Sequence, residues 1–350
     1  MDLSFNNAKV LIVGGAGFVG SNLSHQILNE KPRELIIVDN LISSEKVNIP
    51  NDKNVNFIES SINNNDTLDN LPEDLDFVFH LSCYHGNQSS IADPMADHEN
   101  NTLTSLKLFN RISEIKSIKK VVYAAAACAV AEKTYDDPSA TTEDQPISLY
   151  HDSPYSISKL IGELYGNYFF QHYNLPFVKA RFSNVYGPRE ILGAGRWRGT
   201  IHTIWRNVIP TFIWKSLNGE ALPLDNGGQT SRDFIFAEDM AKGLMCCALN
   251  GNAGEIYNLA TGNETTILDL AKMINDITGN KTPLDLKPAR DWDRSGKRFA
   301  STEKAQKEIG FCSEIDITEG IARTIDWTKS NIDLIESNIT KHQEKLSIKV

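Results

Sequence analysis

The segment from Lys9 to Asp39 constrains the fold of this chain more than any other part of the sequence. It begins with the apolar run 10–13, continues through a glycine-rich stretch and an amphipathic segment, 21–29, and ends with a second apolar run, 35–38, before the acid. This order predicts a buried strand, a tight turn, a helix and a second buried strand. Such alternation is typical of a parallel sheet that helices cover on both faces.

The glycine stretch gives the first indication of function. Gly14, Gly17 and Gly20 are spaced three residues apart, with Phe18 and Val19 between the last two. Glycines at this spacing permit a tight turn, close approach of a pyrophosphate to the backbone, and close packing of helix on strand. The helix N-terminus would offer unpaired N–H groups to the phosphates. A glycine triplet alone also fits an ordinary turn, but strand, helix and acid in register favour a dinucleotide site.

Asp39 indicates which dinucleotide binds. It lies 19 positions after Gly20, where an acid accepts hydrogen bonds from the hydroxyls of the adenosine ribose. A carboxylate repels the 2′-phosphate of NADP, and Asn40 and the two residues after it include no arginine to receive that phosphate. We therefore expect NAD as the cofactor.

Composition excludes several classes of protein. The chain has 350 residues and a net charge of −10, which argues against a general surface for nucleic acid or anionic membranes. The five cysteines form no CxxC pair, and we expect reduced thiols in a cytoplasmic protein without a metal site. The N-terminus lacks the features of a signal peptide, and no apolar run approaches the length of a membrane span.

The rest of the chain predicts an α/β fold with a Rossmann-type, doubly wound parallel sheet. Apolar runs that read as further strands alternate with long segments of helical periodicity. The predicted strands after Asp39 are 55–58, 77–81, 121–123 (running into 124–130) and 177–182, and the predicted helices are 97–116 and 155–173.

The character of the sequence changes at Tyr186. We expect residues 1–185 to form the NAD-binding domain and residues 186–350 mainly a smaller, lid-like substrate-binding domain. A segment near 233–262 should return to the main sheet through a strand at 257–259, and the last thirty residues read as a polar, helix-compatible tail. Further helices are predicted at 239–249 and 267–278.

Tyr155 and Lys159 are the predicted catalytic pair. They are four residues apart, so on a helix they share one face. A nearby ammonium favours the phenolate form of the tyrosine, which can then take a proton from a substrate hydroxyl. The YxxxK pattern also occurs by chance on surface helices, but here it follows a glycine-rich dinucleotide motif. The residues predicted to contact NAD are Gly14, Gly17, Phe18, Val19, Gly20, Asp39, Asn40, Leu81, Tyr155 and Lys159.

The chain resembles the extended short-chain dehydrogenases/reductases, in their nucleotide-sugar epimerase/dehydratase branch. The resemblance covers nearly the whole length and rests on several blocks in order. These blocks are 14–20, 38–41, 78–81, Asn101, 121–123, 153–159, 181–188 and 232–234. It implies a bound NAD that oxidises a sugar, usually at C4, on a nucleoside diphosphate carrier.

The resemblance also assigns roles by position. Asn184 would contact the phosphates or the sugar, and Arg232 and Arg290 would lie near the diphosphate. Asn101 would support the Tyr–Lys pair through backbone or water hydrogen bonds. In this family two helices, here 101–116 and 155–173, form a four-helix bundle across a dimer, so we expect a homodimer or a higher homo-oligomer.

The departures from the family pattern bear on the mechanism. Family members usually carry Ser or Thr, which hydrogen-bonds the reacting hydroxyl, where this chain has Ala126. The carboxylates of 4,6-dehydratases and uronate decarboxylases fall on Ala127 and Cys128, which makes both reactions less favoured here. Cys128 could substitute for the missing hydroxyl or be a structural thiol. Ser61 replaces the usual Asp that holds the adenine amine, and is a weaker partner.

Two loops offer further candidates. His85 follows the fourth strand and would hydrogen-bond a sugar hydroxyl or act as an acid, although a loop histidine bonded to backbone fits equally well. Arg196, Trp197, Arg198 and Arg206 cluster after the sixth strand, where they would bind ligand, contact another subunit or remain solvated. The predicted substrate-binding residues are His85, Ala126, Asn184, Arg196, Arg232 and Arg290.

Three functions remain open on the sequence. The first is a nucleotide-sugar 4-epimerase, and the second is a one-way 4-dehydrogenase whose NADH a second substrate reoxidises. The third is a cofactor-binding protein with little catalysis, suggested by Ala126. The nucleobase and the sugar have no decisive signature in the sequence.

Overall fold

The computed structural model describes residues 3–127, 134–290 and 296–347, and a seven-stranded parallel sheet lies at its centre. The strand order is β11-β6-β5-β4-β1-β2-β3. Along the chain, β2 and β3 are added on one side of β1 and the later strands on its other side, and this change of side defines a doubly wound sheet. The predicted fold class is therefore confirmed. The strands are β1 Lys9–Val13, β2 Glu34–Asp39, β3 Val55–Glu59, β4 Phe77–His80, β5 Lys120–Ala126, β6 Phe177–Phe182 and β11 Ile256–Leu259.

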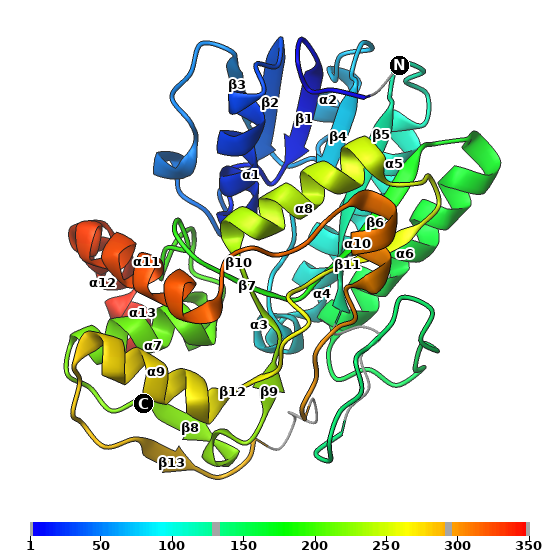
Figure 1. Cartoon of the computed structure of the whole chain (residues 1–350). Coiled ribbons are helices and arrows are strands. Elements are labelled where there is room, and N and C mark those ends of the chain that lie inside the picture. Colours follow the sequence, from blue (N-terminus) through cyan, green and yellow to red (C-terminus); the bar gives the residue numbers. More distant parts are fainter. Residues whose placement is uncertain (1–2, 128–133, 291–295, 348–350) are drawn as a thin grey trace.

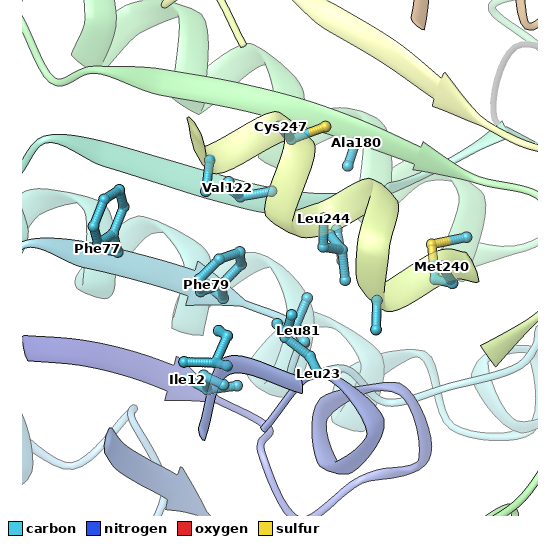
Figure 2. Packing of buried hydrophobic residues seen from close by; sticks show 14 of the residues in the cluster. Ile12, Leu23, Phe77, Phe79, Leu81, Val122, Ala180, Met240, Leu244 and Cys247 are labelled. Carbon is cyan, nitrogen blue, oxygen red and sulfur yellow. The ribbon is translucent and has the colours of Figure 1, made fainter. Parts of the chain in front are cut away.

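Helices pack on both faces of this sheet, because the side chains of each strand alternate between two apolar cores. On one face, α1 (Phe18–Asn29) and α8 (Ala237–Asn250) cover residues such as Ile12 and Phe79. Figure 2 shows Met240, Leu244 and Cys247 along α8, in the same apolar cluster as Phe79, Val122 and Ala180 of the strands. On the other face, α5 (Thr104–Ile112) and α6 (Pro154–Tyr173) cover Val78 and Tyr123.

The helix predicted at 97–116 differs from the observed structure. The helical segment begins earlier, with α4 (Pro94–Asp97), passes through a π-helical turn, η2 (His98–Leu103), and ends with α5 at Ile112. Single π-helical turns inside α-helices are frequent at functional sites. This one contains Asn101, whose side chain is used in the candidate site.

The chain after β6 builds the part of the molecule that lies below the sheet in Figure 1, apart from α8 and α10, which pack on the sheet, and β11, which joins it. The predicted strand at 257–259 is part of β11, which pairs with β6 in parallel. Three small sheets, β7–β10, β9–β12 and β8–β13, connect the remaining elements. Their strands are β7 Asn184–Tyr186, β8 Pro223–Asp225, β9 Ser231–Arg232, β10 Phe234–Phe236, β12 Thr265–Thr266 and β13 Asp285–Lys287.

The polar, helix-compatible tail predicted for the last thirty residues is helical over most of its described part. Its helices are α11 (Ile317–Ser330), α12 (Ile332–Thr340) and α13 (Gln343–Ser347). Ile335 and Ile339 of α12 are buried against the loop that follows β7. The tail therefore packs on a loop of the candidate site. The other helices are α2 Asn65–Asp69, α3 Asn87–Ala92, α7 Val208–Leu217, α9 Ile267–Thr278 and α10 Glu303–Ile309, with short turns η1 Lys46–Asn48, η4 Ile201–Thr203 and η5 Asn226–Gly228.

Candidate active site

The carboxyl ends of the parallel strands open into one pocket that brings together most of the predicted site residues. This is where ligands bind in open α/β sheets. All ten predicted dinucleotide contacts line it, as do five of the six predicted substrate contacts. The substrate contacts at the pocket are His85, Ala126, Asn184, Arg232 and Arg290.

The glycine turn is too crowded for side chains. A Cβ on Gly20 would lie 2.1 Å from the carbonyl oxygen of Gly14, and a Cβ on Gly14 would lie 2.5 Å from the backbone nitrogen of Ser82. Gly14 also has a φ of +88°, which L side chains rarely adopt. Helix α1 begins directly after this turn, and no side chain caps its N-terminus. Its unpaired N–H groups fit a pyrophosphate.

Asp39 ends β2 with its carboxylate at the pocket. Oδ2 accepts a hydrogen bond from the backbone N–H of Ala16 (3.1 Å), and Oδ1 accepts from the Leu41 N–H (2.9 Å) and the Ser44 hydroxyl (2.8 Å). Burial raises the pKa of Asp39, and these hydrogen bonds oppose that rise. Ser61, predicted at the adenine, lines the same pocket. The crowded turn and this acid together fit the two ends of an adenosine diphosphate, so NAD suits the site.

Tyr155 and Lys159 lie on the first turns of α6, whose start is fixed by Ser153 at the N-cap and Pro154 at the first helical position. Lys159 is buried, and its Nζ donates a hydrogen bond to the carbonyl oxygen of Ala124 on β5 (2.9 Å). The same Nζ lies 5.9 Å from the centre of the Tyr155 ring. The sheet thus holds the ammonium beside the phenol.

Asn101 connects this pair to the π-helical turn. Its Nδ2 donates to the Ser158 hydroxyl (3.2 Å), which in turn donates to the backbone carbonyl of Tyr155 (3.0 Å). Its Oδ1 accepts from the backbone N–H of Tyr84 (2.7 Å). These bonds link Asn101, through the side chain of Ser158, to the helix that carries Tyr155 and Lys159.

His80 and His85 differ in their surroundings. His80 is fully buried and bonded through both ring nitrogens, to Ser105 (2.9 Å) and Ser82 (3.3 Å). It is therefore a satisfied core histidine. His85 lines the pocket, its Nε2 lies 3.2 Å from Oδ1 of Asn207, and its ring meets the Tyr155 ring edge to face at 5.7 Å. Burial lowers the pKa of His85 to about 4, which makes the ring neutral.

Arginines line the pocket away from the catalytic pair. Arg232 donates to the carbonyl oxygen of Gly296 (2.8 Å), and Arg290 pairs with Asp225 (2.5 Å). Asn184 is exposed at the start of β7 and lines the pocket as well. These polar groups are of the kind that diphosphates require.

Arg196 is not brought to the pocket. Its side chain is exposed, and its backbone N–H donates to the carbonyl oxygen of Ile42 (3.1 Å). Trp197 packs beside His342 in a small apolar cluster with the C-terminal helices, so it does not stack on a ligand at the pocket. Arg206 does line the pocket, and Arg198 is buried behind it, donating to the carbonyl oxygen of His85 (3.2 Å).

Sequence reasoning missed several residues of the pocket, among them Glu190 and Asn207. The amide of Asn207 donates to Oε1 of Glu190, whose Oε2 is buried without a hydrogen-bond partner in the described part of the chain. Burial raises the pKa of Glu190 to about 7. Neither residue belongs to a recognisable motif. The only signal is that Glu190 follows the Gly-Pro pair that ends β7.

Comparison with known proteins shows to which family the chain belongs. The model of the NAD dependent epimerase/dehydratase family matches residues 10–260. The chain belongs to this family. It is accordingly an NAD-dependent enzyme of the nucleotide-sugar epimerase and oxidoreductase class, and NAD is its cofactor.

Similar proteins are known over the whole length of the chain. The Bordetella bronchiseptica enzyme WbmF, in crystals with NAD⁺ and UDP, is 53% identical, with a TM-score of 0.89 over 98% of this chain and 99% of that one. A putative UDP-glucose 4-epimerase of Methanocaldococcus jannaschii is 30% identical over 92% of this chain and 99% of its own length. The UDP-glucose 4-epimerase of Thermotoga maritima, solved with UDP-glucose, is 26% identical, with a TM-score of 0.82 over 93% and 99% of the two chains.

Two further observations concern the described residues alone. No three His, Cys, Asp or Glu side chains among residues 3–127, 134–290 and 296–347 are grouped so as to hold a metal ion. No helix in these ranges is long and apolar enough to cross a membrane.

Proposed function

We propose that this enzyme is a nucleotide-sugar 4-epimerase acting on a uridine-diphosphate sugar. The observation that carries the proposal is the position of Tyr155 beside the buried Lys159, in a pocket that also contains the dinucleotide turn. The uridine carrier is supported by WbmF, crystallised with UDP, and by the UDP-glucose complex of the Thermotoga enzyme.

The proposed chemistry assigns one task to each group. Tyr155 takes the proton from the C4 hydroxyl, and the Lys159 ammonium, held by the Ala124 carbonyl, stabilises the phenolate. NAD supplies the acceptor for the hydride when it is bound. Arg232 and Arg290 bind the diphosphate, so the sugar is anchored through its carrier.

An anchored carrier suits inversion at C4. The flat 4-keto sugar can turn about its phosphate linkage and present its other face while the diphosphate stays bound. Reduction from the second face then gives the epimer. Elimination of water or carbon dioxide is less favoured because the pocket has Ala127 where dehydratases carry a carboxylate. Cys128, the other such position, lies outside the described residues.

A panel of UDP-, GDP-, CDP- and dTDP-sugars tests the proposal. Incubation with the purified protein should invert C4 of one UDP-sugar without net formation of NADH. Absorbance near 340 nm measures the NADH, and NMR determines the configuration of the product. Stoichiometric NADH and a 4-keto product would instead identify the one-way 4-dehydrogenase. No conversion of any sugar by protein that has NAD bound would identify a cofactor-binding protein.

Adding a hydroxyl at position 126 is expected to increase activity. The residue ends β5 and lines the pocket, at the position where the family resemblance implies a hydroxyl. Ala126→Ser should raise kcat by about tenfold to a hundredfold, since one positioned hydrogen-bond partner contributes on that order. Steady-state kinetics with the active sugar measures this. Ala127→Ser adds the same hydroxyl one residue later and should give no gain. An unchanged or lower kcat in Ala126→Ser would contradict the role given to this position.

We also propose that a second copy of the chain covers the outer face of α6. Four large apolar side chains on this helix are 44–54% exposed: Ile157, Leu164, Tyr168 and Tyr173. Several large apolar side chains exposed on one helix are typical of a surface that another protein chain covers. Leu164→Lys should convert a dimer into a monomer in light scattering after size exclusion. Ile332→Lys, at a similarly exposed position on α12, should leave the dimer intact. A wild-type monomer at micromolar concentration would refute this proposal.

A further inference from the structure

Asn207 occupies a capping position but does not cap. It is the N-cap residue of α7, where an asparagine side chain ordinarily accepts a hydrogen bond from the first turn of the helix and stabilises it. Here the side chain makes no such bond. It turns to the pocket instead, where it contacts Glu190 on one side and His85 on the other. A forgone cap indicates that these contacts serve another purpose.

The two contacts fix the direction of the hydrogen bonds. An ionised Glu190 can only accept, so the Nδ2 of Asn207 faces it and the Oδ1 faces His85. An amide oxygen also only accepts, so Nε2 of His85 must carry the proton across the 3.2 Å contact. The neutral ring then has its lone pair on Nδ1.

Nδ1 is the atom available to a ligand. Among the described residues, hydrogen bonds reach the His85 ring only at Nε2. The ring lines the pocket and lies edge to face against Tyr155. The acceptor atom therefore belongs to a ring that packs against the ring of Tyr155. The same pocket has Ala126 at the end of β5, which offers no hydroxyl.

We propose that Glu190 and Asn207 are positioning residues that hold His85 as a neutral, Nε2-protonated imidazole, whose Nδ1 accepts a hydrogen bond from a hydroxyl of the bound sugar. The identity of the ligand as a sugar rests on the proposed function, whereas the state of the ring does not. This contact orients the sugar and partly replaces the missing hydroxyl at position 126.

The chain of hydrogen bonds from Glu190 through Asn207 to His85, called the relay below, is expected to depend on pH through Glu190. The titratable groups that face this carboxyl are His85 and Arg206, and those that face His85 are Glu190, Arg198 and Arg206. Burial raises the pKa of Glu190 to about 7. Above that pH the ionised carboxylate holds the amide as described. Below it, the protonated carboxyl can donate to Asn207, the amide can turn, and Nδ1 becomes a donor. The contribution of the relay is thus lost as pH falls through about 7.

The state of the ring can be measured without any sugar. NMR of the NAD-bound protein with labelled histidine, with His85 assigned through His85→Gln, should show the proton on Nε2 at pH 8 and its transfer to Nδ1 as pH falls through about 7. The neutral ring should take up no second proton above about pH 5. Asn207→Asp places a carboxylate beside Nε2 and should raise the pKa of His85 by at least about one unit. Glu336→Gln, an exposed change on α12, should alter neither quantity. Titration of wild-type His85 near its ordinary pKa, or no response to Asn207→Asp, would overturn the relay.

Kinetics with the active UDP-sugar tests its role in catalysis. Asn207→Ala should lower kcat by about tenfold, with unchanged affinity for UDP in calorimetry. Glu190→Gln should remove the pH dependence of kcat near 7. Wild-type kcat and an unchanged pH profile in both variants would refute the positioning role. If no sugar is turned over, the proposed function fails, and the NMR titration still decides whether the relay exists.

Discussion

Replacing Tyr155 by Phe is expected to lower kcat by about a hundredfold to ten-thousandfold while NAD remains bound. The phenol is the group placed to take a proton from the sugar, and a positioned acid–base group contributes a factor of this order. The ring itself is retained, so its contacts with His85 and the position of α6 should be preserved. Steady-state kinetics with the active UDP-sugar, together with calorimetric titration of NAD, measures both parts of this prediction.

The matched control is Tyr150→Phe, because Tyr150 precedes the same helix and is 87% exposed. This variant removes a phenolic hydroxyl from solvent only and should retain the wild-type kcat. A Tyr155→Phe enzyme that turns over at the wild-type rate would show that another group carries the proton. Loss of NAD from that variant would also contradict the account, because it assigns Tyr155 the chemistry and leaves most of the affinity for NAD to the glycine turn and Asp39.

The second large effect is expected on stability. Glu163→Gln should lower the free energy of unfolding by about 3–5 kcal/mol, because it leaves the buried charge of Arg181 without a counter-charge. The Arg181 Nε and Nη2 donate to the two carboxylate oxygens at 2.9 and 2.8 Å, and both side chains are 3% exposed or less. Glu163 lies one turn after Lys159 on α6, so this pair ties the proposed catalytic helix to β6.

Urea unfolding followed by circular dichroism measures this change, provided that the dependence on urea concentration is unaltered. Glu314→Gln breaks the exposed pair with Lys242 and should cost less than about 1 kcal/mol. The double variant Glu163→Met/Arg181→Met should recover most of the loss, because no buried charge remains. Equal losses of unfolding free energy in Glu163→Gln and Glu314→Gln would show that the buried pair stabilises the fold no more than the exposed pair does.

Local patterns explain what could be predicted from the sequence. Helix α9 was predicted with its observed bounds because Thr266 caps its start, Gly279 ends it in the left-handed conformation, and an apolar stripe lies between them. The dinucleotide turn was predictable for a similar reason. Its glycines, helix and acid lie within one continuous βαβ unit, so their spacing in the sequence determines their arrangement in space.

What could not be predicted depends on contacts between distant segments. The C-terminal tail appears polar, yet Ile335 and Ile339 bury one narrow face of α12 against the loop after β7. Arg196 was expected at the ligand because it lies in an arginine-rich loop, but its side chain is exposed and does not line the pocket. Glu190 and Asn207 are 17 positions apart in irregular chain, and no periodicity indicates that their side chains meet.

The most direct test of the central claim is isotope retention at C4. The active UDP-sugar, deuterated at C4, should yield an epimer that keeps its deuterium, because the hydrogen abstracted next to Tyr155 returns to the same carbon without exchange with water. NMR and mass spectrometry of the isolated product report this directly. Loss of deuterium to solvent, or inversion at any carbon other than C4, would contradict the account.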